Sequence, residues 1–520
     1  MADLASTYRS QGRWEEAEQL FVQVMETRKT KLGVDHPDTL TSMVDLASTY
    51  RRQGRWKEAE QLFVQAMETS KIKLGVGHPN TLKSMANLAS TYRNQGRWKE
   101  AEQLELQVME SSKTKLGVGH PSTLKNMANL ASTYRSQGRW EEAEQLFVQV
   151  MKTSKTKLGE DHPSTLSTMH ELASTYWNQG RWEEAEQLNV RAMETSKIKL
   201  GVDHPNTLTS MANLASTYRS QGRWKEAEQL FVQAMETSKI KLGVGHPNTL
   251  KSMANLASTY RNQGRWKEAE QLELQVMESS KTKLGVGHPS TLKSMANLAS
   301  TYRSQGRWEE AEQLDVQVME TRKTKLGVDH PDMLKSMANL ASMYRMQSRW
   351  EEAEQLFVQV METRKTKLGV DHPDTLSSMA NLASTYRRQG RWEEAEQLFV
   401  QVMKTSKTKL GVGHPSTLKS MTNLASTYRN QGRWEEAEQL FVQVMKTSKT
   451  KLGEDHPSTL SAMTDLAFTW KSLGHDAQAI DLLRNCLAKQ RQKLGLNHPH
   501  ILSNSRTLLV WETDNLNISS

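Results

Sequence analysis

Tryptophan returns along this chain at a fixed step of 42 residues, and this period constrains the fold more than any other feature of the sequence. The twelve prolines keep the same step, and each directly follows a histidine, from His36-Pro37 to His498-Pro499. A period between about 20 and 50 residues is typical of repeat architectures, in which each unit buries its apolar face against its neighbours. The periodic tryptophans are Trp14, Trp56, Trp98, Trp140, Trp182, Trp224, Trp266, Trp308, Trp350, Trp392 and Trp434.

The composition fits a chain of small stacked units. Hydrophobic residues make up only 36% of the chain, and the mean hydropathy is -0.69. A linear stack keeps much of its surface in water because each unit contacts only its neighbours. A length of 520 residues would by itself predict roughly three or four globular domains. Because of the 42-residue period, we expect one elongated array in place of several globular domains.

The sequence shows no sign of membrane insertion or secretion. No apolar run approaches the roughly 18 residues needed to cross a bilayer, and no signal-peptide pattern follows Met1. The single cysteine, Cys486, excludes an internal disulfide framework. We therefore expect a cytoplasmic protein with no membrane partner.

Residues 36–77 illustrate how one unit is expected to fold. Pro37 suits the first turn of a helix, because its missing N–H group would be unpaired there in any case. Gln53-Gly54 and Leu74-Gly75 end two successive helices, since glycine readily takes the left-handed conformation that closes a helix. At about 100° per residue, two apolar stripes face a common core. They comprise Leu40, Met43, Leu46, Ala47 and Tyr50 in the first helix and Ala59, Leu62, Phe63, Ala66 and Met67 in the second.

The spacing of residues 87–105, NLASTYRNQGRWKEAEQLE, resembles the tetratricopeptide repeat, with a small residue, tyrosine, glycine, an aromatic residue and alanine at set offsets. The 42-residue length and the Leu-Gly-x-x-His-Pro linker are similar to the kinesin light chain type of this repeat. Near-identical arrays of this kind also form the C-terminal part of fungal NOD-like proteins. The sequence supplies no heptad segment of the kind that joins a kinesin light chain to its motor.

The resemblance implies an all-α fold, a right-handed α-solenoid superhelix of about twelve 42-residue helix-turn-helix units. We expect residues 1–35 to be a truncated first repeat and residues 36–455 to be ten near-identical units. Residues 456–497 would form a degenerate last repeat, residues 498–511 a C-terminal capping helix and residues 512–520 a tail. Because Met1 aligns with Met43, inside a first helix, we expect that the sequence starts at an internal repeat methionine.

A polar row on the first helix of each unit is the main candidate for binding. In tetratricopeptide arrays the face opposite the core stripe lines a concave groove. An asparagine recurs there, and its amide both donates and accepts, so a ladder of such amides could pair with the backbone of an extended peptide. The alternative is a solvated position copied by duplication. The row comprises Asn87, Asn129, Asn213, Asn255, Asn297, Asn339, Asn381 and Asn423.

Two basic rows run beside the asparagines. If both reach the groove, it should attract acidic peptides; the alternative is ordinary surface charge. One row comprises Lys83, Lys125, Lys251, Lys293, Lys335 and Lys419. The other comprises Arg51, Arg93, Arg135, Arg219, Arg261, Arg303, Arg345, Arg387 and Arg429, and it is interrupted by Trp177. Trp177 could anchor a ligand side chain, or it could reflect drift.

One core position of the second helix varies in polarity. Phenylalanine occupies it in most units, but Glu105, Asn189, Glu273 and Asp315 replace it in four. A buried carboxylate without a partner is costly, so we expect this site to be partly wet. Cys486 and the repeated methionines fall on apolar stripes and are expected in the core.

No pattern in the chain indicates catalysis or a cofactor. The His-Pro pairs occur once per unit, too far apart for a shared metal, and we assign them to the starts of helices. Phosphate-binding glycine motifs are absent. A net charge of +9 makes nucleic-acid binding an alternative function. Helical repeats that read bases, however, need different side chains from unit to unit at the positions that contact the bases, whereas these units repeat the same ones.

We therefore predict a non-catalytic scaffold that binds a protein or peptide and takes no small-molecule substrate. One alternative remains open, in which the array is the recognition arm of a larger protein whose effector domain lies upstream.

Overall fold

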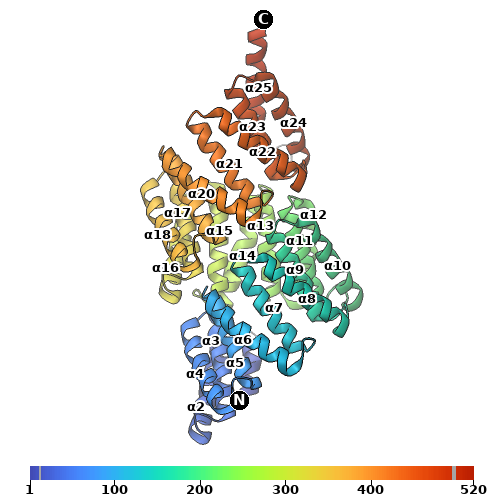
Figure 1. Cartoon of the computed structure of the whole chain (residues 1–520), viewed down its shortest axis with the longest axis vertical. Helices are drawn as coiled ribbons and strands as arrows, with labels where there is room; N and C mark the ends of the chain where they lie inside the picture. The colour runs from blue at the N-terminus through green and yellow to red at the C-terminus, as the bar shows by residue number, and fades with distance from the viewer. Residues whose placement is uncertain (11–12, 495–498, 520) are drawn as a thin grey trace.

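The chain folds into a solenoid of paired antiparallel helices, as Figure 1 shows from the N-terminal end at α2 to the C-terminal end at α25. This computed structural model describes residues 1–10, 13–494 and 499–519, which form 25 helices and no strand. The prediction of an all-α solenoid with a period of about 42 residues is confirmed.

Each unit contributes a first helix and a second helix. The first helices are α1 (Ala2–Ser10), α3 (Pro37–Arg52), α5 (Pro79–Asn94), α7 (Pro121–Ser136), α9 (Pro163–Asn178), α11 (Pro205–Ser220), α13 (Pro247–Asn262), α15 (Pro289–Gln305), α17 (Pro331–Met346), α19 (Pro373–Arg388), α21 (Pro415–Asn430) and α23 (Pro457–Ser472). The second helices are α2 (Trp14–Leu32), α4 (Trp56–Leu74), α6 (Trp98–Leu116), α8 (Trp140–Leu158), α10 (Trp182–Leu200), α12 (Trp224–Leu242), α14 (Trp266–Leu284), α16 (Trp308–Leu326), α18 (Trp350–Leu368), α20 (Trp392–Leu410), α22 (Trp434–Leu452) and α24 (Asp476–Leu494).

The helix boundaries follow local signals in the sequence. The His36 Nδ1 atom accepts a hydrogen bond from the Asp38 N–H group at 3.2 Å, so the histidine caps the helix that Pro37 begins. At the other end of α3, Gly54 has a φ of 77°, which lies in the left-handed region. The predicted role of the His-Pro pairs in starting helices is therefore confirmed.

The core runs through the solenoid as a series of small clusters. In the second unit Met43, Ala47, Ala59 and Phe63 are buried together, and Leu88 of the next unit packs against them. Cys486 is buried as predicted. Each unit shares its core with the next, so the units are not independent domains.

Polar contacts on the second helices also join neighbouring units. The Arg55 guanidinium donates to Glu18 Oε1 of the preceding unit at 2.7 Å and to Glu58 Oε1 of its own unit at 2.9 Å. The same guanidinium lies 4.1 Å from the centroid of the Tyr50 ring. Copies of this arrangement recur along the array, as at Arg97 with Glu60.

The last helix, α25 (Pro499–Ser519), continues past Trp511, where the sequence pattern predicts its end. Residue 498, at which the predicted capping helix begins, lies outside the described residues. Trp511 is buried and meets the Phe468 ring edge to face, with ring centroids 5.0 Å apart. This contact fastens α25 to the final helix pair.

Candidate functional site

The first helices line the inner side of the solenoid. The non-sequential helix pairs in most extensive contact each join two first helices, such as α3 with α5 and α21 with α23. First helices therefore lie closer to the superhelix axis than second helices. The asparagine, lysine and arginine rows lie on these helices, so a ligand within the superhelix would meet them.

The eight asparagines of the row share one environment. Each side chain is half-buried. Within the described chain, their hydrogen bonds come from the main chain and not from the side chain, as when the Asn129 carbonyl oxygen accepts from Arg93 at 3.1 Å. No side-chain amide of the row is paired within the described residues, so both amide groups are available to a ligand.

The lysine row is exposed beside the asparagines. Lys83, Lys125, Lys251 and Lys293 are each at least partly exposed, and each is the fifth residue of its helix. Partial burial, together with the neighbouring ammonium groups of Lys335 and Lys251, lowers the pKa of Lys293. Lys251, Lys293 and Lys335 are thus close enough to repel one another.

The arginines connect neighbouring units, a role that the sequence did not indicate. Arg93 donates to the Asn129 carbonyl oxygen, and Arg135 donates to the Glu171 carbonyl oxygen at 3.1 Å and pairs with its carboxylate at 2.7 Å. Each guanidinium therefore holds the first helix of the following unit. In units with phenylalanine at the variable position, the arginine also lies over that ring, as Arg51 does over Phe63 at 5.7 Å.

Some of these arginines form no ion pair with a carboxylate in the part of the chain that the structure describes. Burial, and then the neighbouring cations Arg52 and Arg93, lower the pKa of Arg51 to about 10. Burial likewise lowers the pKa of Arg387 to about 10; the Arg388 cation is the second-largest cause, and the Asp465 carboxylate acts in the opposite direction. Cations that lower each other's pKa in this way repel one another, and a bound anion would reduce this repulsion.

The polar residues at the variable core position are buried, so the expectation of a partly wet site is wrong. Glu105, Glu273 and Asp315 expose 3%, 1% and 2% of their surface. Each carboxylate pairs with the arginine of its own unit, at 3.5 Å for Glu105 with Arg93, at 3.3 Å for Glu273 with Arg261, and likewise for Asp315 with Arg303. The inner-face arginines compensate charges that would otherwise be isolated in the core.

The unit that contains Trp177 replaces this ion pair with neutral contacts. The side chain of Asn189, at the variable position, lies 2.9 Å from His170 Nδ1 and donates to Thr217 Oγ1 at 3.0 Å. His170 Nε2 lies 2.8 Å from Ser210 Oγ. Trp177 stands where the arginine would be and is 43% exposed. In this unit the arginine is absent and the residue at the variable core position is neutral. No buried carboxylate is therefore left without a counter-charge.

A second set of contacts joins successive turns of the superhelix, and the sequence did not reveal it. The His330 ring stacks on the Trp56 ring with centroids 4.3 Å apart, although the two residues lie seven units apart. His330 Nε2 also lies 3.0 Å from the carbonyl oxygen of Asn94, the last residue of α5. We call this set the inter-turn seam. Its ring pairs are Trp14–His288, Trp56–His330, Trp98–His372, Trp140–His414 and Trp182–His456.

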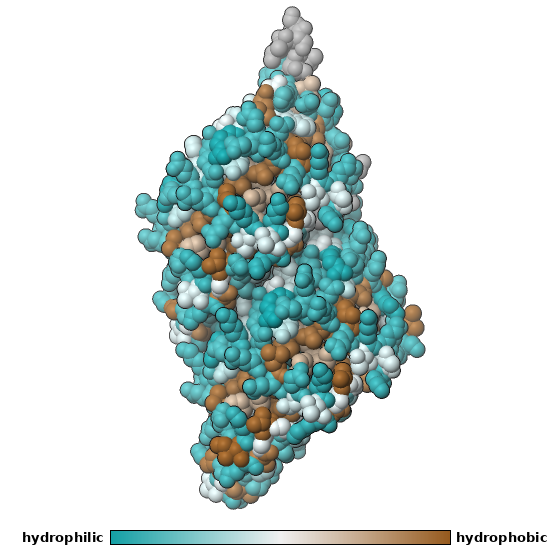
Figure 2. All heavy atoms as spheres, in the orientation of Figure 1, coloured by the Kyte–Doolittle hydropathy of each residue, from teal (hydrophilic) through white to brown (hydrophobic). Residues whose placement is uncertain are grey.

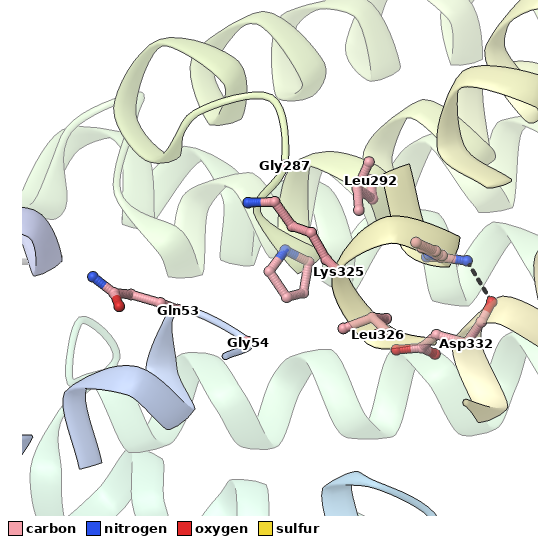
Figure 3. A pocket seen from close by; sticks show the side chains of 9 residues that line it. Gln53, Gly54, Gly287, Leu292, Lys325, Leu326 and Asp332 are labelled. Atoms are coloured by element: carbon pink, nitrogen blue, oxygen red, sulfur yellow. Dashed lines mark hydrogen bonds between the residues drawn. The ribbon is translucent and has the colours of Figure 1, made fainter. Parts of the chain in front are cut away.

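Proline and glycine complete the seam. A Cβ atom added to Gly96 would lie 2.5 Å from Pro331 Cγ, so only glycine allows this approach. Figure 3 shows the same place one unit earlier, where Gln53 and Gly54 of the first turn face Gly287 and Lys325 of the second across a small pocket. The histidines, prolines and tryptophans recur in nearly every unit, so no local signal in the sequence tells which two units will meet across the seam.

Comparison with known proteins identifies the repeat. Models of the tetratricopeptide repeat family match residues 1–72, 81–122, 122–198, 167–240, 221–282, 253–324, 290–366, 332–408, 417–458 and 459–500. These matches cover most of the chain. The chain belongs to the tetratricopeptide repeat family. A search of curated proteins gave no match.

Solved tetratricopeptide structures include similar arrays. A kinesin light chain-like protein with nearly identical repeats from Podospora anserina is 34% identical, with a TM-score of 0.34 over 39% of this chain and 97% of that one. A variant of that protein gives the same identity and coverage with a TM-score of 0.35. The protein BtubC from P. vanneervenii is 17% identical, with a TM-score of 0.35 over 45% of this chain and 92% of that one.

The rest of the tetratricopeptide array offers little other chemistry. In the part of the chain that the structure describes, no group of three or more histidine, cysteine or acidic side chains could hold a metal ion. No helix within the described ranges is long and apolar enough to cross a membrane. Figure 2 shows apolar side chains in small patches between hydrophilic ones on the face in view. The polar inner face therefore remains the strongest candidate for binding.

Proposed function

We propose that this tetratricopeptide array is a protein-interaction scaffold that holds an extended peptide against the inner faces of its first helices. The observation that carries the proposal is the row of eight half-buried asparagines whose amides are unpaired within the described chain. A half-buried amide without a partner gains from a ligand that supplies both a donor and an acceptor. The backbone of an extended peptide supplies both at every residue.

The charge of the inner face favours an acidic peptide. Lys251, Lys293 and Lys335 stand in three successive units. Burial, and then the ammonium groups of the other two lysines, lower the pKa of Lys293, so the three cations lie close enough to repel one another. Arg51 and Arg387 add positive charge, and neither forms an ion pair with a carboxylate within the described residues. A peptide rich in aspartate and glutamate would relieve this repulsion, and its association should weaken as salt screens the charges.

Binding of labelled, unstructured peptides to the full chain tests the proposal. An Asp/Glu-rich peptide should bind more tightly than a neutral peptide of the same length, and the difference should shrink with added salt. Equal binding of the two peptides at low salt would argue against an acidic ligand. An RNA oligonucleotide that binds more tightly than the acidic peptide would instead favour the nucleic-acid alternative.

The array supplies a matched control for the asparagine row. Replacing Asn87, Asn213 and Asn255 with alanine removes three members of the row. Replacing Asn80, Asn206 and Asn248 with alanine changes the same three units next to their helix caps. The first variant should lose about tenfold or more in affinity, since each lost amide contact is worth roughly 0.5–1.5 kcal/mol, whereas the second should bind as the unaltered chain does. Equal affinity of both folded variants would refute the ladder.

A further inference from the structure

The arginine row of the inner face is not uniform, because only some of its members pair with a carboxylate. Among the described residues, Arg345 and Arg387 are the only unpaired members that lie in successive units. Arg51 and Arg219 are also unpaired, but each stands alone between units whose arginine is paired or absent. The paired members are Arg93 with Glu105, Arg135 with Glu171, Arg261 with Glu273, Arg303 with Asp315 and Arg429 with Asp465.

Two contacts hold each of these unpaired guanidinium groups in place. Arg345 donates through Nη1 to the Asn381 carbonyl oxygen at 3.2 Å, and its guanidinium lies 5.6 Å from the centroid of the Phe357 ring. Arg387 makes the same two contacts in the next unit, at 3.2 Å and 5.8 Å. The Nε and Nη2 groups of both arginines donate to no residue in the part of the chain that the structure describes. One edge of each planar group is therefore held in position and available to a ligand.

A third guanidinium lies beside these two. Arg388, the last residue of α19, is exposed and forms no ion pair within the described ranges. Burial, and then the Arg388 charge, lower the pKa of Arg345. Burial and the same charge lower the pKa of Arg387 to about 10, where Arg429 and Arg345 add to the effect and Asp465 opposes it. The three guanidinium groups of Arg345, Arg387 and Arg388, which we call the arginine triad, therefore lie close together.

We propose that the arginine triad binds the phosphoryl group of a phosphorylated serine or threonine in the peptide that the first helices hold. This inference rests on the proposed function and specifies its ligand. A phosphoryl group on a side chain carries about 1.5 to 2 negative charges and three acceptor oxygens, whereas a carboxylate carries one charge and two oxygens. Planar guanidinium groups bind phosphate through paired N–H donors. Three such groups with little carboxylate nearby therefore suit a phosphoryl group better than an aspartate or a glutamate.

The second unit shows what separates the triad from an ordinary arginine pair. It repeats the doublet as Arg51-Arg52, but the arginine of the preceding unit, Arg9, pairs there with Asp45 at 3.2 Å. Asparagine stands at that position beside the triad, as Asn381. One carboxylate therefore neutralises a cation in the second unit that remains unpaired in the triad.

Three forms of one labelled, acidic, unstructured peptide test the proposal on the full chain. The central residue of the peptide is serine, aspartate or phosphoserine. The phosphoserine form should bind about tenfold more tightly than the aspartate form, since it adds hydrogen bonds between charged groups. Equal binding of these two forms would overturn the phosphoryl site and leave the proposed function standing, whereas failure of all three to bind would overturn both. Free O-phosphoserine that binds as tightly as the phosphopeptide would also overturn the proposal, because the peptide would then contribute nothing.

Removing the charge of the doublet should remove the preference for phosphoserine. The variant carries Arg387→Gln and Arg388→Gln. Its matched control carries Lys404→Gln and Lys407→Gln, which remove the same charge from exposed positions on α20. The control should retain the roughly tenfold preference. Circular dichroism checks that both variants remain helical.

A second variant leaves every arginine in place. Asn381→Asp should pair with Arg345 as Asp45 pairs with Arg9, and should abolish the preference for the phosphoserine form over the aspartate form. Asn381→Ala removes the same amide without adding charge, so it should keep the preference even where both peptides bind more weakly. A preference that survives Asn381→Asp, or one that survives loss of the doublet, would overturn the proposal.

Discussion

At the scale of single residues, one core position shows how the array tolerates change. Phe231 fills it in the sixth unit, with the Arg219 guanidinium 5.7 Å from the ring centroid. Glu273 fills it in the seventh unit and pairs with Arg261. The sequence shows the exchange but not the partner, because Arg261 and Glu273 lie on different helices. The arginine can form a cation–π contact with an aromatic ring or an ion pair with a carboxylate. The core position can therefore hold either phenylalanine or glutamate.

The ion pair at this position should be costly to break and unnecessary for stability. Replacing Arg261 with methionine leaves the buried Glu273 without its counter-charge and should destabilise the array by about 3 kcal/mol. Replacing Glu273 with phenylalanine restores the residue of the neighbouring unit and should leave stability equal or higher. Urea unfolding measures both changes. An Arg261→Met variant as stable as the unaltered chain would show that the pair does not act as described.

Ser348 is strained where other units have glycine. Its φ is 62°, and it is the one non-glycine residue with positive φ in the described chain. A left-handed conformation costs a residue with a Cβ atom roughly 1–2 kcal/mol, so Ser348→Gly should stabilise the array by about 1 kcal/mol. The reciprocal change Gly390→Ser, at the same site of the next unit, should cost a similar amount, because nothing else lies within 4 Å of its Cβ position. Urea midpoints that move in the same direction for both variants would contradict this.

At the scale of helices, the sequence predicted the boundaries well because their causes are local. A histidine cap, a proline and a glycine all act within one turn of the helix that they begin or end. The asparagine row could be placed on one face from helical periodicity alone. The seam could not be predicted, because His330 and Asn94 lie 236 residues apart. Their meeting depends on small rotations between units, added over a full turn.

A pair of glycine variants should separate the seam from helix strain. In the first, Gly96, Gly138 and Gly222 become alanine, and each new Cβ would lie within 3 Å of a proline of the next turn. In the second, Gly306, Gly390 and Gly432 become alanine with nothing within 4 Å. All six have φ between 74° and 79°, so the backbone cost is equal.

Only the first glycine variant should push the turns apart. Its radius of gyration in small-angle X-ray scattering should exceed that of the unaltered chain, while the second variant should match the unaltered chain in size. If the two variants have the same radius, the seam contributes nothing to the spacing of the turns.

At the scale of the whole molecule, we expect the inter-turn seam to make the pitch of the superhelix depend on pH. Burial lowers the pKa of the seam histidines, to about 4 for His288, where Lys325 adds to the effect. At His330 the carboxylate of Asp332 and the Arg322 guanidinium act in opposite directions, and burial outweighs them. A base whose pKa is lowered in the closed form stabilises that form fully above its ordinary pKa, about 6.5, and loses this contribution as the pH falls.

Acidification should therefore elongate the molecule between about pH 6.5 and pH 4, and scattering should detect this as a rise in maximum dimension. Asp315 cannot cause the change, because burial raises its pKa to about 6 and its site becomes more stable in acid. Replacing His288, His330, His372, His414 and His456 with asparagine keeps the helix caps but removes the protons, so elongation on acidification should disappear. The same exchange at His36, His78, His120, His162 and His204 keeps the seam intact and should retain it. If both variants elongate alike, protonation elsewhere opens the coil, because only the first set lies between turns.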